Sequence, residues 1–542
     1  MDLTKQAYLH GSLVDGSNFS MMKSIFHILA FIIGFIQPIM AQYGDLDSTF
    51  NINGRVTTGF LPHSGHANSG GLQSDGKIIA AGTVQSGNNA YFGVARYNSN
   101  GKLDTTFGVV GKAIIQIGTQ NRDHVRALRI QPDDKIIIAG ITLKDTNSHI
   151  ALIRLSPNGV LDSTFGLNGV TILELEGRGN NGTSLAIQED GKIFLAGYTS
   201  SPNTDALVCR FTPDGKPDSS FGIFGKVVTD IPWLSNGANA IAIQRDGKVV
   251  TGGFVGFAHN GVAVYDFSLI RFYENGILDS TFNMDGIVRT SISQWVDQLY
   301  GLAIQPDGKI VAAGHTNSGD PNHSNYDFVV MRYNEDGTLD TGFGIDGQVI
   351  TSFGTSDDGA NSVAIQPDGK IVAVGQTSYW FDSDFALTRY HIDGTIDTTW
   401  GIGGKATTDF NSSSDYGSSM VLQTDGKIVA MGSSENDFAI ARYLSGLIVG
   451  VIDLTSVDGV LLYPNPVQEY ETLEYTLKQD ETLTIELYNI AGQLIKVFVS
   501  QRKSSSGTYR ESLYFDDHMI PGIYFLRLSN EHGGLSVKIL KQ

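Results

Sequence analysis

One short sequence recurs along the chain, and its clearest copy is QPDGKIVAAG, from Gln305 to Gly314. Its core, Gln-x-Asp-x-Lys, begins seven times, at Gln73, Gln131, Gln188, Gln244, Gln305, Gln366 and Gln423. Successive copies start 56 to 61 residues apart. A fixed period of this length is typical of a repeat architecture, so the fold is set by what one unit can form.

Two further elements recur with the same period. Variants of LDSTF end at an aromatic residue seven times, at Phe50, Phe107, Phe165, Phe221, Phe282, Phe343 and Trp400. An arginine followed by an apolar residue also occurs seven times, at Arg96, Arg154, Arg210, Arg271, Arg332, Arg389 and Arg442. The chain therefore contains seven units of one design.

Each unit predicts four short strands, and one unit shows them well. They are GQVITSF from Gly347, ANSVAIQ ending at Gln366, KIVAVGQ from Lys370 and DFALTRY ending at Tyr390. Each is a run of β-branched and small apolar residues, and Asp-Gly turns separate them. Four antiparallel strands per unit predict an all-β, seven-bladed β-propeller over residues 42–446. An open solenoid is the alternative, because it stacks the same units without closing.

The phase of the repeat favours closure. The chain enters the array with Leu46–Phe50, an element that elsewhere follows the strand containing the arginine. It leaves the array at Arg442-Tyr443 with no such element behind it. The N-terminal segment can therefore complete the seventh unit and close the ring.

The motifs QPDGKIVAAG and FVVMRYNEDGTLDTGFG resemble the delta-60 repeats of secreted bacterial proteins. The resemblance covers about residues 44–445, with all three elements in order. It implies a β-propeller and brings no known activity with it.

A different pattern follows Ser445. A linker is expected at 447–460, and alternating apolar residues in 461–542 predict a small β-sandwich. This segment resembles the C-terminal sorting domain of type IX secretion in Bacteroidetes. The resemblance rests on Tyr463-Pro464-Asn465-Pro466, the IAGQLI turn, the PGIYFLRL segment with Gly522 and Tyr524, and the lysine-rich end. It implies export by the type IX machinery, to the medium or the outer cell surface.

The N-terminal region predicts an export signal. Residues 21–41 have Lys23, an apolar run from Ile25 to Ile39 and the small residue Ala41. A membrane anchor is the alternative interpretation. Residues 1–20 do not fit a signal, and we interpret them as a non-native upstream extension.

The composition excludes some classes of binding partner. The chain has 56 acidic and 37 basic residues, a net charge of −19, which disfavours nucleic acid and anionic membranes. The single cysteine, Cys209, excludes an intrachain disulfide and is interpreted as a small core residue. The protein is expected to be a monomer.

The charged motifs of the repeat are interpreted as structural. A phosphate loop needs G-x-x-x-x-G-K-[ST] before a helix, whereas here a strand follows and one copy replaces the glycine with Asp134. The sequence NEDGTLD lacks the distal glutamate of a calcium loop. The recurrent arginine and a recurrent aspartate are expected to form a bridge in every blade.

No motif of a known catalytic centre is present, so no catalytic residue and no cofactor are predicted. A weak metal hypothesis remains for the loop that contains His315, Asp320 and His323, with Asp327 as a further oxygen ligand. A solvated polar loop is the favoured interpretation.

Variation between units indicates where a ligand binds. In an up-and-down blade the uniform turns QxDGK and xxGxLDxxFG open at one end of the ring, so the variable connections share the other end. Loops displayed on a rigid frame are where function concentrates. The candidate ligand-binding residues at that end are Trp233, Trp295, Tyr300, Tyr326, Tyr379, Trp380, Asp382 and Tyr416.

Aromatic, amide and carboxylate side chains suit carbohydrate or protein recognition. The sequence therefore predicts a secreted or cell-surface binding or scaffold propeller whose partners are the type IX machinery and an extracellular glycan or protein. A propeller-fold hydrolase or lyase acting on polysaccharide is the alternative, although the sequence shows no acid pair that breaks the repeat.

Overall fold

The structure is a computed structural model that describes most of the chain after residue 42. The described residues are 43–118, 122–144, 147–175, 179–200, 204–231, 234–259, 262–317, 319, 325–354, 357–379, 382–410, 414–445, 457–463, 467, 469–489, 494–515, 519, 522–530 and 534–541. Their regular elements are all β-strands, and they include no helix long and apolar enough to cross a membrane. The predicted signal 21–41, the upstream residues 1–20 and most of the predicted linker 447–460 lie outside the described residues.

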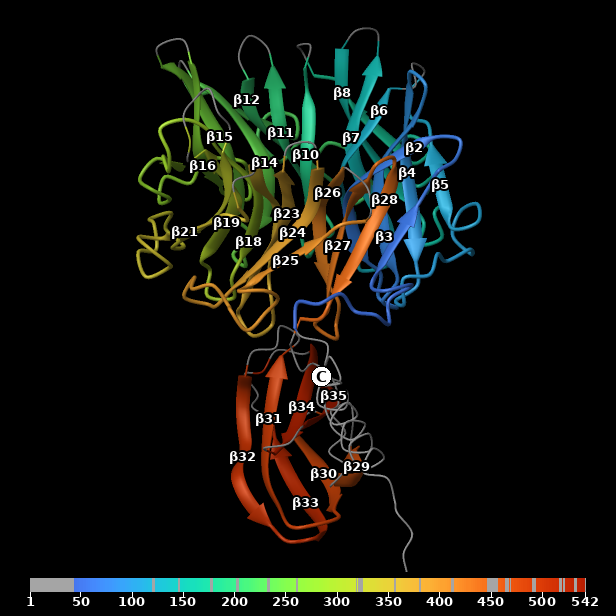
Figure 1. The fold of residues 1–542 in the computed structure, drawn as a ribbon, viewed down its shortest axis with the longest axis vertical. Helices are drawn as coiled ribbons and strands as arrows, with labels where there is room; N and C mark the ends of the chain where they lie inside the picture. Colours follow the sequence, from blue (N-terminus) through green and yellow to red (C-terminus); the bar gives the residue numbers. More distant parts are fainter. Residues whose placement is uncertain are drawn as a thin grey trace, which may run out of the picture. The chain divides into compact units, whose positions relative to one another are not determined.

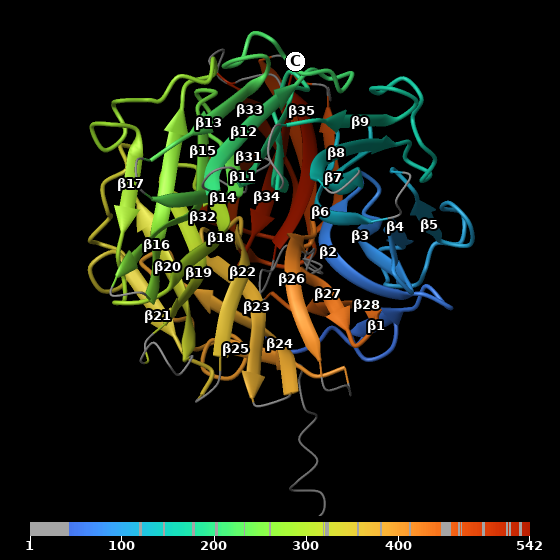
Figure 2. The same cartoon turned by 90° about the horizontal axis from the view of Figure 1, so that it is seen from above.

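Seven four-stranded antiparallel sheets stand around one axis as the blades of a β-propeller (Figures 1 and 2). Blade 1 is β2 (Ser64–Leu72), β3 (Ile78–Ser86), β4 (Asn89–Tyr97) and β5 (Lys112–Ile115). Blade 2 is β6 (Asp123–Ile130), β7 (Ile136–Lys144), β8 (Asn147–Leu155) and β9 (Val170–Leu173). Blade 3 is β10 (Asn181–Ile187), β11 (Ile193–Ser200), β12 (Thr204–Phe211) and β13 (Lys226–Thr229).

The remaining blades follow the same plan. Blade 4 is β14 (Ser235–Ile243), β15 (Val249–His259), β16 (Val262–Phe272) and β17 (Ile287–Thr290). Blade 5 is β18 (Asp297–Ile304), β19 (Ile310–Asn317), β20 (Tyr326–Tyr333) and β21 (Gln348–Thr351). Blade 6 is β22 (Asp357–Ile365), β23 (Ile371–Tyr379), β24 (Asp382–Tyr390) and β25 (Lys405–Thr408). Blade 7 is β26 (Asp415–Leu422), β27 (Ile428–Ser434), β28 (Asp437–Tyr443) and, from the other end of the chain, β1 (Arg55–Thr58).

The first strand of each blade lies nearest the axis. These seven inner strands, β2, β6, β10, β14, β18, β22 and β26, pack against one another around the ring. The four-residue strands lie at the other edge of each sheet, where Ile114, Val228 and Ile350 are nearly half exposed. The inner strands therefore line the axis of the ring.

The order of strands corrects the predicted unit. GQVITSF was expected to be the first strand of its unit, but β21 pairs with β20 and is the outer strand of blade 5. The link 334–347, in which Gly347 N donates to Phe343 O, joins these two strands within one blade, whereas the link from β21 to β22 crosses between blades. The sequence gives the order of the strands, but not which neighbour each one pairs with.

Every inner strand carries a β-bulge at the same place. The bulged residues are Asn68, Arg126, Thr183, Asn239, Tyr300, Asn361 and Ser418. The bulge explains the last glycine of QPDGKIVAAG, because a Cβ at Gly314 would lie 1.9 Å from Gln298 O in the facing strand. The equivalent glycine of every other blade meets the same kind of carbonyl, at 1.8–2.0 Å.

The apolar cores lie between adjacent blades. One such core joins Ile79 and Phe92 of blade 1 to Val125, Leu128 and Ile136 of blade 2. Both faces of a sheet are thus buried only when it has a neighbour on each side. This is why the β-branched strands of the repeat stack into a ring.

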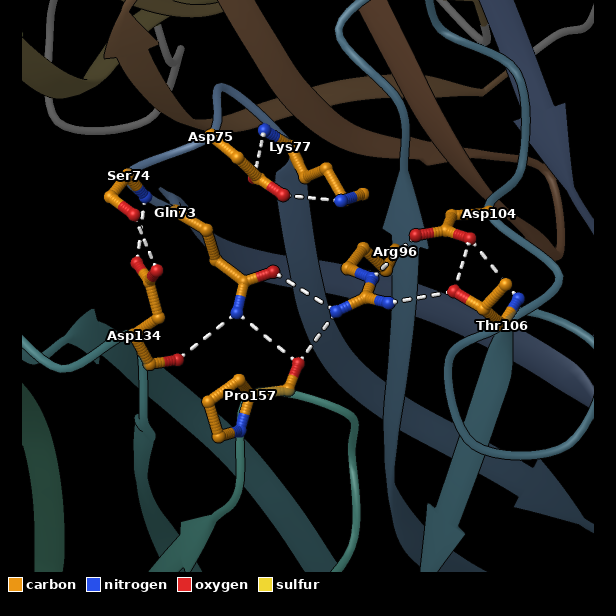
Figure 3. Close-up of polar contacts among 9 residues, drawn as sticks. All are labelled: Gln73, Ser74, Asp75, Lys77, Arg96, Asp104, Thr106, Asp134 and Pro157. Atoms are coloured by element: carbon orange, nitrogen blue, oxygen red, sulfur yellow. Dashed lines mark hydrogen bonds and ion pairs between the residues drawn. The ribbon is translucent and has the colours of Figure 1, made fainter.

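The predicted arginine–aspartate bridge is present in all seven blades. The pairs are Arg96–Asp104, Arg154–Asp162, Arg210–Asp218, Arg271–Asp279, Arg332–Asp340, Arg389–Asp397 and Arg442–Asp47. In blade 1, Arg96 Nε lies 2.9 Å from Asp104 Oδ2 (Figure 3). The guanidinium also lies over the ring of Phe107. Arg96 Nη1 also donates to Pro157 O of blade 2 at 2.6 Å. Each arginine therefore ties its own blade to the next.

The seventh pair closes the ring. Arg442 near the end of β28 pairs with Asp47, which precedes β1 by eight residues, and both are almost fully buried. Strand β1 pairs with β28 over Arg55–Thr58, and Gly44 N donates to Leu444 O. The predicted completion of the last blade by the N-terminal segment is confirmed.

The motif QxDGK forms a turn between the inner strand and its neighbour. In blade 1, Gly76 has a positive φ of 81°, and Asp75 accepts from the backbone of Lys77. Asp134 takes the same conformation at φ 62°. The amide of Gln73 donates to Asp134 O and Pro157 O of the next blade (Figure 3). The motif is thus a turn that also joins blades.

The C-terminal residues form two sheets. One is β29 (Val457–Tyr463), β30 (Tyr470–Leu477) and β33 (Gly507–Tyr514). The other is β32 (Leu494–Ser504), β31 (Glu481–Asn489), β34 (Gly522–Ser529) and β35 (Gly534–Lys541). One core, with Leu473 and Tyr475 from the first sheet and Ile485 and Leu526 from the second, joins them. The predicted β-sandwich is confirmed.

Candidate functional site at the variable end of the ring

The variable connections gather at one end of the ring, which we call the variable end. Parallel bridges between Ala90 and Arg122, Ser148 and Gly179, and Tyr265 and Val296 place the start of each third strand beside the start of the next inner strand. The hairpins before the third strands and the links between blades therefore share that end. The QxDGK turns lie at the opposite end of the same strands.

An aromatic cluster lies at this end of blade 5. The ring of His315 on β19 lies 5.4 Å from that of Tyr300 and 4.6 Å from that of Tyr326, between centroids. Tyr300 is the bulged residue of the inner strand and donates through its hydroxyl to Gln298 Oε1. Tyr326 N donates to Asp357 Oδ1 of blade 6 at 3.2 Å. We call Gln298, Tyr300, His315, Tyr326 and Asp357 the blade 5 cluster.

A glycine of blade 6 makes room for this cluster. A Cβ at Gly359 on β22 would lie 3.4 Å from His315 Nδ1, so the imidazole packs directly against the inner strand of the next blade. Most sister blades carry a larger residue at this position, for example His124 and Tyr416. Gly359 in blade 6 thus leaves room for the imidazole of His315 in blade 5.

Burial controls the charge of the cluster. It lowers the pKa of His315 to about 4, against the opposing charge of Asp357. Burial, with the neighbouring Tyr326 and Tyr198, raises the pKa of Tyr300 to about 12. At neutral pH the cluster therefore presents a neutral imidazole and neutral phenols beside a carboxylate.

Three carboxylates meet between blades 6 and 7. Oxygen atoms of Asp384, Asp409 and Asp415 lie within 4.8 Å of one another. Burial, with the charges of Asp409, Asp382 and Asp415, raises the pKa of Asp384 to about 6. Asp415 is fully buried and accepts from Phe410 N at 2.6 Å.

This acidic group does not have the arrangement of a glycosidase pair. Asp or Asn recurs at the position of Asp415 in six blades, where Asp123, Asp297 and Asp358 also accept from the backbone of the preceding link. Two glycosidase carboxyls stand roughly 5–10 Å apart with the substrate between them. A buried aspartate that accepts hydrogen bonds from the link before it has a structural role instead.

The structure describes only some of the predicted ligand-binding residues. It brings Tyr300 and Tyr326 together, and it adds His315 from the weak metal hypothesis. Trp295 is half-buried in a link, Tyr416 is exposed on β26, and Asp382 is exposed at the start of β24. Trp233, Trp380, Asp320 and His323, together with the side chain of Tyr379, lie outside the described residues. In the tail, Tyr463 is exposed and Tyr524 buried, while Pro464, Asn465 and Pro466 also lie outside.

Sequence reasoning found Tyr300 and Tyr416 on the inner strands but missed other residues there. Gln298 was not singled out, nor were Arg122, His124 and Arg126 in blade 2. The available signal was the segment RDHVRALRI, whose sister segments carry no lysine or arginine at the same positions. Aligning the inner strands of the repeat and looking for its exceptions would have found them.

Comparisons with known proteins identify both parts of the chain. A family model described as a domain of unknown function (DUF5122) β-propeller matches residues 73–107, 131–165, 188–221, 305–343, 366–399 and 423–446. A model described as a secretion system C-terminal sorting domain matches residues 461–542. Curated protein sequences give no match.

Several solved structures are similar at low identity. PorZ, a surface component of the type IX secretion system of Porphyromonas gingivalis, is 11% identical with a TM-score of 0.39; the match covers 87% of this chain and 59% of that chain. The polysaccharide lyase Uly1 is 12% identical with a TM-score of 0.41, covering 75% and 97%. Sqt1 from Chaetomium thermophilum is 12% identical with a TM-score of 0.37, covering 71% and 97%.

The sorting tail marks the protein as one exported to the outer cell surface or the medium. The repeats and the tail match the two resemblances read from the sequence, in the same order along the chain. The chain therefore carries DUF5122 β-propeller repeats followed by a type IX secretion sorting domain.

Proposed function

We propose that the propeller is an extracellular binding module that holds a glycan at the variable end of the ring, on the blade 5 cluster. The observation that carries the proposal is the meeting of Tyr300, His315 and Tyr326 at ring distances of 4.6 and 5.4 Å. All three are partly exposed, and two of them come from the residues that the sequence selected for a ligand.

The chemistry of the cluster suits a sugar. Aromatic rings offer flat apolar surface to the C–H face of a pyranose, and their polar ends hydrogen-bond. Gln298 and Asp357 supply amide and carboxylate groups at the same place for hydroxyl groups. Because His315 is neutral at neutral pH, it can donate from one ring nitrogen and accept at the other.

A glycan array with the purified chain tests the proposal. Tyr326→Ala should weaken binding of a hit about tenfold or more, because base or sugar stacking on one ring is worth over about 1 kcal/mol. Phe224→Ala is the matched control, since it removes an aromatic ring that is 80% exposed in a turn at the opposite end. Equal binding by the wild type and Tyr326→Ala would refute the assignment of the site.

Cleavage of a polysaccharide is the second candidate function, and one observation favours it. The imidazole of His315 lies between the phenols of Tyr300 and Tyr326 at ring distances of 5.4 and 4.6 Å, which places three groups able to transfer protons together, as general acid–base catalysis uses. Incubation with each array hit, followed by assay of new reducing ends and unsaturated products, tests it. Product formed by the wild type and lost in His315→Ala would establish an enzyme; intact ligand with all hits would leave binding alone.

A further inference from the structure

One inner strand differs from the other six in charge. Strand β6 of blade 2 carries Arg126 and Arg129 with His124, and Arg122 directly precedes it. The other inner strands contain no lysine or arginine. We call Arg122, His124, Arg126 and Arg129 the β6 basic strip.

The arginines of the strip have no carboxylate partner among the described residues. Arg122 and Arg126 are exposed, and none of the ion pairs found in that part of the chain includes them or Arg129. Arg129 is partly buried, and its guanidinium donates at 2.8 Å to the carbonyl of its own neighbour, Leu128. By contrast, each of the seven repeat arginines has an aspartate.

These positive charges lie close to one another. Alternate residues of a strand are about 6–7 Å apart on the same side, which places His124 between Arg122 and Arg126. Burial lowers the pKa of His124, and the charges of Arg126 and Arg122 lower it further. A protein with 56 acidic and 37 basic residues thus keeps, in the part of the chain that the structure describes, three arginines without an ion pair on and beside one inner strand.

The strip faces the blade 5 cluster across the axis. Blade 2 is three blades away from blade 5 in one direction and three away from blade 6 in the other, so β6 lies opposite the seam that holds Tyr326 and Asp357 (Figure 2). Arg126 occupies the same bulge position on β6 as Tyr300 does on β18. A ligand that spans the axis can therefore contact both sides.

We propose that the β6 basic strip binds the oxyanion of an acidic polysaccharide, a carboxylate or a sulfate ester, while a neighbouring sugar stacks on the blade 5 cluster. The proposal rests on the proposed glycan binding and names its ligand class. The planar guanidinium matches the two oxygens of a carboxylate or sulfate with paired hydrogen bonds. Asp357 of blade 6 lies beside the blade 5 cluster and repels an anion there, which fixes the direction of the ligand.

The test compares charged and neutral forms of the same polymer with the full chain. The probes are polygalacturonate against its methyl ester, and dextran sulfate against dextran, titrated at low and high salt. The wild type should prefer the charged member of at least one pair by about tenfold or more, and the preference should shrink at high salt because screening weakens surface charge interactions. The pair that shows the preference tells carboxylate from sulfate.

Variants locate the effect. Arg126→Gln should remove the preference for the charged polymer and leave binding of the neutral polymer unchanged, and Arg126→Lys should restore part of it. Arg245→Gln is the matched control, because it removes one exposed positive charge in the turn at the opposite end. Since Arg126 is itself exposed, its loss leaves the packed core intact.

Several outcomes would overturn the inference. A wild type with no preference for either charged polymer, or Arg126→Gln with an unchanged preference, would remove the oxyanion site. Polyaspartate that competes as well as the charged polymer would show that the strip binds acidic peptides instead. If Tyr326→Ala alone abolishes binding of neutral polymers and no charge preference exists, the oxyanion site fails and glycan binding stands. If free sulfate raises the melting temperature through Arg126 and no polymer binds, glycan binding fails.

Discussion

The closing pair of the ring gives the sharpest test of how the fold is held. Arg442 and Asp47 are separated by almost the whole propeller in sequence, yet Arg442 Nη2 lies 2.9 Å from Asp47 Oδ2. Arg442 also donates to Thr49 Oγ1 and to Ser99 O of blade 1. We therefore expect Arg442→Met to weaken the one blade that is assembled from both ends of the chain.

The magnitude follows from burial. The side chains of Arg442 and Asp47 are 6% and 4% exposed, so the methionine variant leaves a buried carboxylate whose remaining cation, Lys427 Nζ, lies 3.5 Å away. Removing one partner of a buried pair costs about 3–5 kcal/mol in the free energy of unfolding. Asp47→Asn added to Arg442→Met should recover part of that loss, because the asparagine needs no counter-charge.

Urea unfolding and amide hydrogen exchange measure the two consequences. Arg332→Met is the matched control, since Arg332 pairs with Asp340 eight residues further along the chain. Both variants should lose similar stability, but only Arg442→Met should expose the amides of β1, Arg55–Thr58, to fast exchange. A loss below about 1 kcal/mol, or equal protection of β1 in both variants, would refute the argument that this pair closes the ring.

The remaining predictions concern glycine, acid and the tail. Gly314→Ala should destabilise the propeller by about 1–3 kcal/mol or more in urea unfolding, because its Cβ would meet Gln298 O at 1.9 Å, whereas Gly87→Ala, with open space around it, should cost less than Gly314→Ala. Although burial opposes ionisation, hydrogen bonds from Thr281 and Tyr273 and the charge of Arg271 lower the pKa of Asp279 to about 2. Ionised Asp279 therefore stabilises the fold above about pH 4, and this stabilisation is lost as the pH falls towards 2. Asp279→Asn should flatten this part of the stability–pH curve, and an unchanged curve would contradict the prediction. In the tail, burial raises the pKa of Glu471 to about 7, so its protonated form is favoured in the fold and stability is lost as the pH rises from about 4.5 through 7. Glu471→Gln should therefore raise the melting temperature of the tail at pH 8 and not at pH 4, and a gain of equal size at both values would refute the role of that proton.

The fold was largely predictable because seven copies of one unit each predict the same strands and turns. The recurrence of Gln-x-Asp-x-Lys, of the aromatic after LDST and of the arginine predicted seven units, their strands and the charged bridge, and Leu46–Phe50 predicted closure. The pairing of the strands could not be predicted from the sequence. GQVITSF is sequence-adjacent to two strands, and only the structure shows that β21 pairs with the preceding β20.

The candidate site was predictable only in part. Variation between units predicted a site at the variable end, including Tyr300 and Tyr326, which the structure brings together, because loops that differ on a uniform frame carry specificity. The partners of those residues could not be found in the same way. His315 was interpreted as part of a solvated polar loop, with metal binding as a weak alternative, and its contact with Tyr300 depends on the bulge in β18 and on Gly359 in the next blade.

By itself, the sequence determined the architecture of this protein, because each unit repeats the same local pattern of strands, turns and buried charges. The C-terminal sorting domain determined that the protein is exported. Tertiary structure decided which exceptions to the repeat lie together. Arg126 and Tyr300 are far apart in the chain and occupy the same bulge position in their blades, and the closed ring places their strands, β6 and β18, on opposite sides of one axis. The physical reason is closure: a local pattern fixes each blade, whereas the number of blades in the ring fixes which side chains face one another.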